Sequence, residues 1–177
     1  PVPDLLIATI RETLTSVEDL AEWQNVRASE IHHELKRLGH IPAGPDLLIY
    51  HQDDYREVDL DVEVGTIIRQ ARNNTEKREV IGEIHIHTLF GVNQAASMIT
   101  SAARGSLSET YAKLAYWTQI NGFRAIGPWR ELTYQQDEPS SIQVIEVQRP
   151  IMKAIEFYYP LEVNKMEPKI ITRPAFT

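Results

Sequence analysis

GPWRELTY, residues 127–134, consists of a Gly-Pro turn followed by a short run of aromatic and β-branched residues. A similar arrangement occurs in the first half of the chain, where Gly44-Pro45 precedes DLLIY at 46–50. Gly-Pro marks a turn, and a short apolar or alternating run after it is typical of a strand. The two stretches therefore predict two equivalent strands, one in each half of the chain.

A second predicted strand follows in each half at the same distance. It reads DVEVGTII at 61–68 and VIEVQRPI at 144–151. The proline of each turn precedes the glutamate of this second strand, Glu63 or Glu146, by 18 positions. One offset of 83 residues therefore superposes both landmarks. A shared order and spacing of this kind predicts an internal repeat.

Upstream of each turn, the pattern predicts a helix preceded by a strand. Apolar residues recur at helical spacing in 27–39 and 106–123, and each segment contains a glycine near its end, where a left-handed residue is favoured. Strand patterns precede them at 4–12 and 80–90, and the polar stretch 69–79 is expected to link the halves. Each half thus reads strand–helix–strand–strand.

This order predicts an α+β fold of two pseudo-symmetric modules. A three-stranded sheet with one helical layer buries one face and leaves the other bare. We expect the modules to join at their first strands into a continuous antiparallel sheet, with the helices on one face. The open face would form a central ligand cleft. The expected organisation is one domain over 1–165, with repeats at 4–68 and 80–160, and a C-terminal tail at 166–177.

Composition excludes several functional classes. The chain has 177 residues, no cysteine, and 18 Lys and Arg against 25 Asp and Glu, a net charge of −7. Disulfides and thiolate metal sites are therefore ruled out, and direct contact with nucleic acid is disfavoured because phosphate binding needs a basic face. No apolar run is long enough to cross a membrane, and no signal peptide or nucleotide-binding loop is visible. We expect a cytoplasmic protein without a cofactor. Because the chain begins with Pro1 rather than Met, an N-terminal segment is expected to be missing or to have been removed.

The repeat resembles a known family. Gly127-Pro128-x-x-Glu131-x-x-Tyr134, the strand that ends at Ile151, and the weaker first copy are similar to the GyrI-like small-molecule-binding domain. This bacterial domain also forms the effector-binding half of AraC- and MerR-type multidrug-sensing regulators of transcription. The resemblance extends from about residue 4 to about residue 160 and implies a tandem of strand–helix–strand–strand modules, with a ligand cleft between them.

The resemblance also implies roles for two residues. In the multidrug-sensing members, an acid on the strand after the second Gly-Pro faces the cleft and pairs with lipophilic cations, and Glu131 matches that position. An aromatic residue at the start of the second helix lines the same cleft and matches Tyr111. Some members are hydrolases that open cyclopropane rings of DNA-alkylating natural products with a Glu and a Tyr, which would be Glu131 and Tyr111 here.

Strand alternation adds further candidates. It places Trp129 beside Glu131 on one face, a pair that suits a planar cation because an indole attracts positive charge. The other interpretation of Glu131 is an exposed acid that lies among aromatic residues by chance. Tyr50 and Tyr134 are weaker candidates for the cleft. Glu63 and Glu146 are equally compatible with a cleft role and with solvent exposure.

The histidines allow two interpretations. In EIHIH, residues 83–87, alternation puts His85 and His87 on one face, and we expect them to face the trough and to contact the ligand. A His-x-His pair can bind zinc, but a site needs a third converging ligand, and none is evident, so no metal is predicted. His32 and His33 are expected on a solvated helix face.

The leading functional hypothesis is therefore a binding module for small lipophilic, cationic or polyaromatic compounds. It would act as a drug sensor, an effector domain or a sequestering resistance protein. A hydrolase that uses the same cleft is the alternative. The expected partners are a second copy of the chain, in a homodimer, or a fused or partner DNA-binding domain. Only such a DNA-binding domain would supply contact with DNA.

Overall fold

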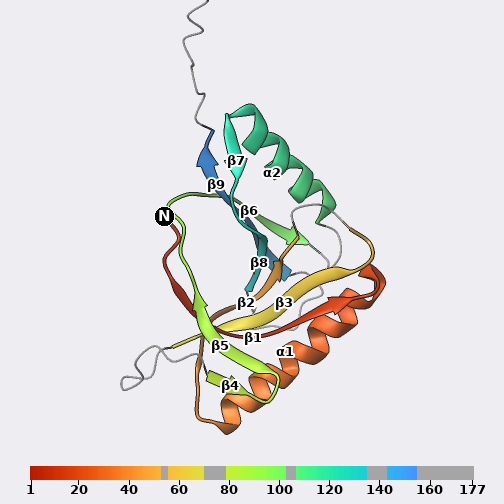
Figure 1. Cartoon of the computed structure of the whole chain (residues 1–177), viewed down its shortest axis with the longest axis vertical. Coiled ribbons are helices and arrows are strands. Elements are labelled where there is room, and N and C mark those ends of the chain that lie inside the picture. Colours follow the sequence, from red (N-terminus) through yellow and green to blue (C-terminus); the bar gives the residue numbers. More distant parts are fainter. Residues whose placement is uncertain (53–55, 70–78, 103–106, 135–142, 155–177) are drawn as a thin grey trace, which may run out of the picture.

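The computed structural model describes residues 1–52, 56–69, 79–102, 107–134 and 143–154. Its strands form one antiparallel sheet in the order β4-β5-β1-β3-β2-β8-β9-β6, with β7 paired to β9 (Figure 1). Two helices complete the α+β fold, as the sequence predicts. The elements are β1 (Leu5–Leu14), η1 (Val17–Asp19), α1 (Leu20–Arg37), β2 (Pro42–Tyr50), β3 (Leu60–Ile68), β4 (Glu79–Ile81), β5 (Ile84–Leu89), β6 (Ala95–Ala102), α2 (Ser108–Ile120), β7 (Phe123–Ala125), β8 (Trp129–Tyr134) and β9 (Gln143–Lys153).

The first unit consists of β1, α1, β2 and β3, with β3 paired between β1 and β2. The helix ends before Gly39, whose φ of 78° is the left-handed conformation expected there. It begins at Leu20 rather than at residue 27, because the short 3-10 turn η1 leads directly into it. Leu20 and Trp23, in the early turns of α1, pack against the core of the unit.

The second unit consists of β6, α2, β8 and β9, with β9 paired between β6 and β8. The prediction that residues 80–90 open this unit is wrong. They form the hairpin of β4 and β5, which pairs with β1 and extends the first unit. The reversal occurs at Gly82, whose φ of 61° few other residues adopt readily. The first strand of the second unit is β6.

The two units join through β2 and β8, not through their first strands as expected. In this pairing Leu48 lies opposite Glu131, and these are the two residues that the 83-residue offset equates. The pseudo-twofold axis of the repeat therefore passes through this pair. The first strands β1 and β6 lie on the outer sides of β3 and β9, so one strand separates each of them from the β2–β8 pair.

Both helices pack against the same face of the sheet, which we call the helical face. Ile31 and Leu35 of α1 are buried with Ala8 and Ile10 of β1 in the core of the first unit. Leu114 of α2 is buried with strand residues of β9 in a separate, smaller core. No helix among the described residues is long and apolar enough to cross a membrane.

The opposite face, which we call the open face, is covered at its centre by chain. Residues 90–94 connect β5 to β6, which forms the opposite edge of the sheet. This connection pairs with the N-terminus through a bridge between Val2 and Val92. The carbonyl of Phe90 accepts a long hydrogen bond, 3.5 Å, from Arg130. Ile7, Leu47 and Ile49 are fully or nearly fully buried on this face. The centre of this face is therefore not bare, contrary to the prediction, and the cleft described below lies on the helical face instead.

Candidate functional site

A cleft of about 650 Å³ lies on the helical face, between the start of α1 and the start of α2. The central strands β2 and β8 form its floor, because joining the units through these strands leaves their two helices apart. Its walls are mainly apolar, which is typical of small-molecule sites. The lining residues are Val17, Leu20, Ala21, Gln24, Leu48, Tyr50, Gln52, Arg56, Leu60, Leu107, Ser108, Tyr111, Ala112, Ala115, Trp129, Glu131, Thr133, Gln143 and Ile145.

Glu131 lies on the floor of this cleft at the pseudo-twofold axis and is only 7% exposed. Its Oε1 accepts a hydrogen bond of 2.5 Å from the hydroxyl of Tyr111 and one of 3.1 Å from the hydroxyl of Tyr50. The interpretation as a chance surface acid is therefore wrong. One tyrosine comes from each unit, so the carboxylate links the two halves of the fold.

The Tyr111 hydroxyl remains a hydrogen-bond donor over the whole physiological pH range. Burial raises the pKa of Tyr111 far above its usual range, and the nearby Glu131 carboxylate and Tyr50 raise it further. A phenol in this setting keeps its proton because an ionised oxygen would be both desolvated and repelled. Tyr111 is therefore a neutral donor to Glu131, and the Tyr50 hydroxyl donates to the same oxygen.

Trp129 packs edge-on against Tyr111, with ring centroids 4.8 Å apart and an interplanar angle of 77°. The guanidinium of Arg149 lies over the indole, 4.8 Å from the centroid. An arginine above an aromatic ring makes a cation–π contact. The protein's own cation thus covers one face of the indole, a partner that the sequence did not suggest.

Tyr50, Tyr111, Trp129 and Glu131 meet in the cleft as predicted, but other candidates lie elsewhere. Tyr134 points to the open face, where its hydroxyl donates to Glu146 at 2.8 Å. His85 and His87 face the same side, because they alternate with Ile84 and Ile86, which pack in the core beside α1. These three residues do not reach the cleft, since the cleft lies on the helical face.

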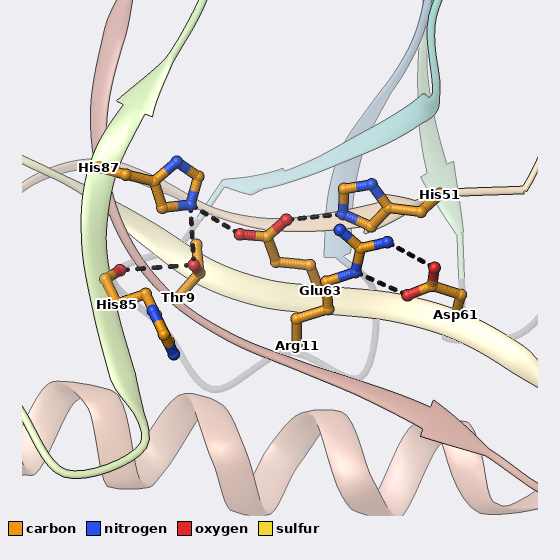
Figure 2. Close-up of polar contacts among 7 residues, drawn as sticks. All are labelled: Thr9, Arg11, His51, Asp61, Glu63, His85 and His87. Atoms are coloured by element: carbon orange, nitrogen blue, oxygen red, sulfur yellow. Dashed lines mark hydrogen bonds and ion pairs between the residues drawn. The ribbon is translucent and has the colours of Figure 1, made fainter. Parts of the chain in front are cut away.

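Glu63 is buried at the centre of a polar cluster on the open face (Figure 2). His51 Nε2 donates to its Oε2 at 2.6 Å, and His87 Nε2 donates to its Oε1 at 2.9 Å. The hydroxyl of Thr9 lies 3.1 Å from the same His87 nitrogen. Glu63 therefore neither lines the cleft nor faces solvent, the two interpretations that the sequence left open. It is a buried residue held by two histidines.

Burial alone would raise the pKa of Glu63, but the hydrogen bonds from His51, His87 and Thr9 outweigh it and hold this pKa far below its usual range. Glu146 is more exposed. Burial also opposes its ionisation, and hydrogen bonds from Ser97, Gln148 and Tyr134 lower its pKa. Both glutamates of the repeat are thus ionised, hydrogen-bonded residues of the open face.

This cluster has the wrong geometry for a metal ion. His51 and His87 each direct their Nε2 at an oxygen of the Glu63 carboxylate, so both nitrogens are engaged in hydrogen bonds. The ring of His85 points away from Glu63 (Figure 2). Across the described ranges, no three His, Asp or Glu side chains are placed to bind a metal.

The depressed pKa of Glu63 predicts a loss of stability in acid. Because its folded-state pKa lies below the ordinary value of 4.5, the stabilisation is complete above that pH and declines as pH falls through and below it. We expect Glu63→Gln to remove up to about 1.4 kcal/mol per pH unit from the acid slope of the unfolding free energy. Urea unfolding between pH 3 and pH 7 measures this, with exposed Glu22→Gln as control. Parallel pH profiles for Glu63→Gln and the parent would contradict the account.

Several cleft residues had no usable signal in the sequence. Val17, Leu20 and Gln24 line the cleft from η1 and the first turns of α1, before the predicted start of that helix. Gln143 begins β9, and its buried Oε1 has no hydrogen-bond partner among the described residues. His32 was expected on a solvated face but is half-buried, and it forms a 2.7 Å hydrogen bond with Asp46 of β2 that raises its pKa.

The fold is similar to several solved structures at low sequence identity. The crystal structure of the EcmrR C-terminal domain matches with a TM-score of 0.70 and 19% identity, over 86% of this chain and 94% of that one. EcmrR in a complex with DNA gives the same score, with 55% of that chain covered. SAV2435 bound to tetraphenylphosphonium matches with a TM-score of 0.57 and 14% identity, over 85% of this chain and 90% of that one.

A hydrolase encoded by lin2189 from Listeria innocua matches with a TM-score of 0.56 and 11% identity, over 85% of this chain and 89% of that one. Comparisons with models of protein families and with curated proteins give no match. The structural likenesses establish the fold, which agrees with the GyrI-like architecture expected from the sequence.

Proposed function

We propose that the protein binds small lipophilic cations in the cleft between α1 and α2, with Glu131 as their counter-ion. The observation that carries the proposal is the position of this carboxylate. It lies almost fully buried at the junction of the two units, on the floor of a cleft with apolar walls. A cation that enters such a site gains Coulomb attraction in a poorly solvated environment and buries apolar surface.

The chemistry of the walls fits such a ligand. Tyr50 and Tyr111 hold the carboxylate, and the edge-on contact of Tyr111 with Trp129 makes a rigid aromatic corner. Aromatic walls bind organic cations through their rings as well as through apolar contact. The fold neighbour SAV2435, bound to tetraphenylphosphonium, supports this ligand class.

The biological role that we propose is that of an effector-binding or sequestering domain. The fold neighbour EcmrR occurs in a complex with DNA, and this chain corresponds to 55% of that protein's length. A fused or partner domain would then contact DNA, because the chain itself is net acidic. The multidrug range and bacterial origin implied by the resemblance, and the cytoplasmic location expected from composition, stay predictions.

The test is a thermal-shift titration with tetraphenylphosphonium. At a concentration about 100 times the dissociation constant, binding stabilises the folded state by about 2.7 kcal/mol. For a chain of this size we therefore expect the melting temperature to rise by about 5 °C or more, and to keep rising with the logarithm of the ligand concentration. Triphenylphosphine oxide, a neutral analogue, should give a much smaller rise. Equal shifts for both compounds, or none for either, would contradict the proposal.

The second candidate is a hydrolase, and one observation favours it. Oε1 of Glu131 and the hydroxyl oxygen of Tyr111 are 2.5 Å apart, so a candidate general base and a phenol hydrogen-bond donor lie together in the cleft. A hydrolase is also among the fold neighbours. Incubation with a cyclopropane-bearing alkylator, followed by mass spectrometry, separates the two functions. Many water adducts per protein molecule indicate the hydrolase, and stoichiometric binding indicates the module.

A further inference from the structure

The same open-face contact occurs once in each unit. His51, just after β2, donates to Glu63 of β3 at 2.6 Å, and Tyr134, at the end of β8, donates to Glu146 of β9 at 2.8 Å. The 83-residue offset relates His51 to Tyr134 and Glu63 to Glu146. We call each contact a strand-end staple. The repeat thus has the same staple in both halves, with an imidazole in one and a phenol in the other.

Each staple fixes the end of a strand whose preceding residue lines the cleft. Tyr50 immediately precedes His51, and Thr133 immediately precedes Tyr134. Because successive side chains of a strand point to opposite faces, Tyr50 and Thr133 line the cleft while their neighbours form the staples. In each unit, the residue that forms the staple on the open face is therefore the chain neighbour of a residue that lines the cleft on the helical face.

The first staple is the more strongly built of the two. Glu63 is 5% exposed, and its second oxygen is held by His87 of β5 (Figure 2). Beside it, Asp61 binds the same strand end twice. Its carbonyl accepts from the His51 N–H at 2.9 Å, and its N–H donates to Gln52 Oε1 at 2.6 Å.

Asp61 is itself fixed by Arg11, whose Nε donates to its carboxylate at 2.7 Å. The cluster therefore anchors residues 50–52, at the point where the chain leaves β2. Two of these three residues, Tyr50 and Gln52, line the cleft. The Tyr50 hydroxyl must lie within reach of Glu131 to donate its hydrogen bond. A strand end that is free to rotate would not keep this hydroxyl in place.

We infer that His51 and Glu63 are positioning residues for the ligand cleft, acting through Tyr50. They hold the end of β2 so that the Tyr50 hydroxyl meets the Glu131 carboxylate and shapes the aromatic corner. His87 shares the same buried carboxylate but belongs to β5, away from the cleft. Its contact stabilises the sheet without fixing Tyr50. This inference rests on the proposed function only where it is tested by ligand binding, because the positioning of Tyr50 can also be measured without a ligand.

The experiment compares His51→Asn with His87→Asn, each of which removes one imidazole hydrogen bond to an oxygen of Glu63. Both variants should lower the melting temperature by similar amounts, since each loses one hydrogen bond to a buried charge. Only His51→Asn should weaken tetraphenylphosphonium binding, by about fivefold, measured by isothermal titration calorimetry. Equal affinities in the two variants, whether lowered or unchanged, would overturn the inference.

A double-mutant cycle with Tyr50→Phe tests whether His51 acts on the cleft through the Tyr50 hydroxyl. If His51 acts through the Tyr50 hydroxyl, His51→Asn should reduce affinity in the parent and change it much less when Tyr50 is already phenylalanine. Fully additive losses would show that His51 does not act through this hydroxyl, which overturns the inference. The cycle also separates positioning from a general loss of stability, because a structural effect would be the same in both backgrounds.

A spectroscopic arm keeps the inference testable if the parent protein binds no cation. The 13C signal of the Glu131 carboxyl group reports its hydrogen bonds, and Glu131→Gln identifies that signal. We expect His51→Asn to shift it and His87→Asn to leave it in place. A shift without ligand binding would leave the positioning role intact and reject the proposed function. An unchanged signal in His51→Asn would overturn the positioning role.

Discussion

Glu131→Gln is expected to reduce the affinity for tetraphenylphosphonium by about 30-fold or more, and to leave binding of a neutral analogue nearly unchanged. The substitution keeps the size of the side chain and removes its charge. Truncating one partner of a buried charge pair costs about 2–5 kcal/mol, and an amide cannot replace the Coulomb attraction to a phosphonium ion. Glutamine can still accept the tyrosine hydrogen bonds, so the cleft should keep its shape.

The matched control is Glu146→Gln. It removes a carboxylate from the neighbouring strand β9, but on the open face, where its partners are Tyr134, Ser97 and Gln148. The net charge changes equally in both variants, so a long-range field effect would act on both. Affinity should fall only in Glu131→Gln. Equal losses in the two variants would show that net charge, and not the cleft carboxylate, attracts the cation.

Gly65→Ala is expected to destabilise the protein by about 3 kcal/mol or more, at the upper end of typical overpacking costs. Gly65 lies opposite Thr9 in the pairing of β3 with β1. An added Cβ would lie 2.4 Å from the carbonyl oxygen of Ala8 and 2.4 Å from Cγ2 of Thr9. The carbonyl belongs to the backbone of the central sheet and cannot move without breaking strand pairing. Urea unfolding at neutral pH measures the effect.

Gly39→Ala is the matched control, because it isolates backbone strain from steric overlap. Gly39 has a φ of 78° and no atoms near an added Cβ, so alanine there costs only the strain of a left-handed residue, about 1 kcal/mol. The backbone of Gly65, by contrast, is not left-handed, so the cost of alanine at this position comes only from steric overlap. A loss at Gly65 no larger than at Gly39 would contradict the packing described for β1 and β3.

Much of the fold was readable from the repeat, because the Gly-Pro turns and the shared spacing are local patterns. The run at 129–134 forms β8 with the predicted bounds. Leu48 and Glu131, which the repeat makes equivalent in sequence, also lie opposite each other in the sheet. Which strands join the units was not readable, because pairing between distant strands depends on burial across the whole sheet.

The misassigned strands have local causes. β6 reads AASMITSA, and its alanines and serines give too little strand signal to predict a strand there. Residues 80–90 have a strong strand pattern, but Gly82 divides them into a hairpin whose partner, β1, lies far away in sequence. A strand pattern shows that a segment is extended and does not show which edge of the sheet it will join.

The site was predicted in part. Alternation along β8 correctly placed Trp129 and Glu131 on one face, and the resemblance added Tyr111. The contact of Arg149 with the indole, and the bracketing of Glu63 by His51 and His87, join segments that are distant in sequence, so no local pattern could indicate them. Tyr134 was assigned to the cleft although alternation put it on the opposite face from Glu131.

The account depends on a ligand that binds on the helical face, between the two units. Intermolecular NOEs between the phenyl protons of tetraphenylphosphonium and assigned methyl groups test this most directly. We predict NOEs to the methyl groups of Leu48, Leu107 and Ile145, which line the cleft. NOEs confined to exposed methyl groups elsewhere, such as Ile99 on β6, or no NOEs at a saturating concentration, would contradict the account.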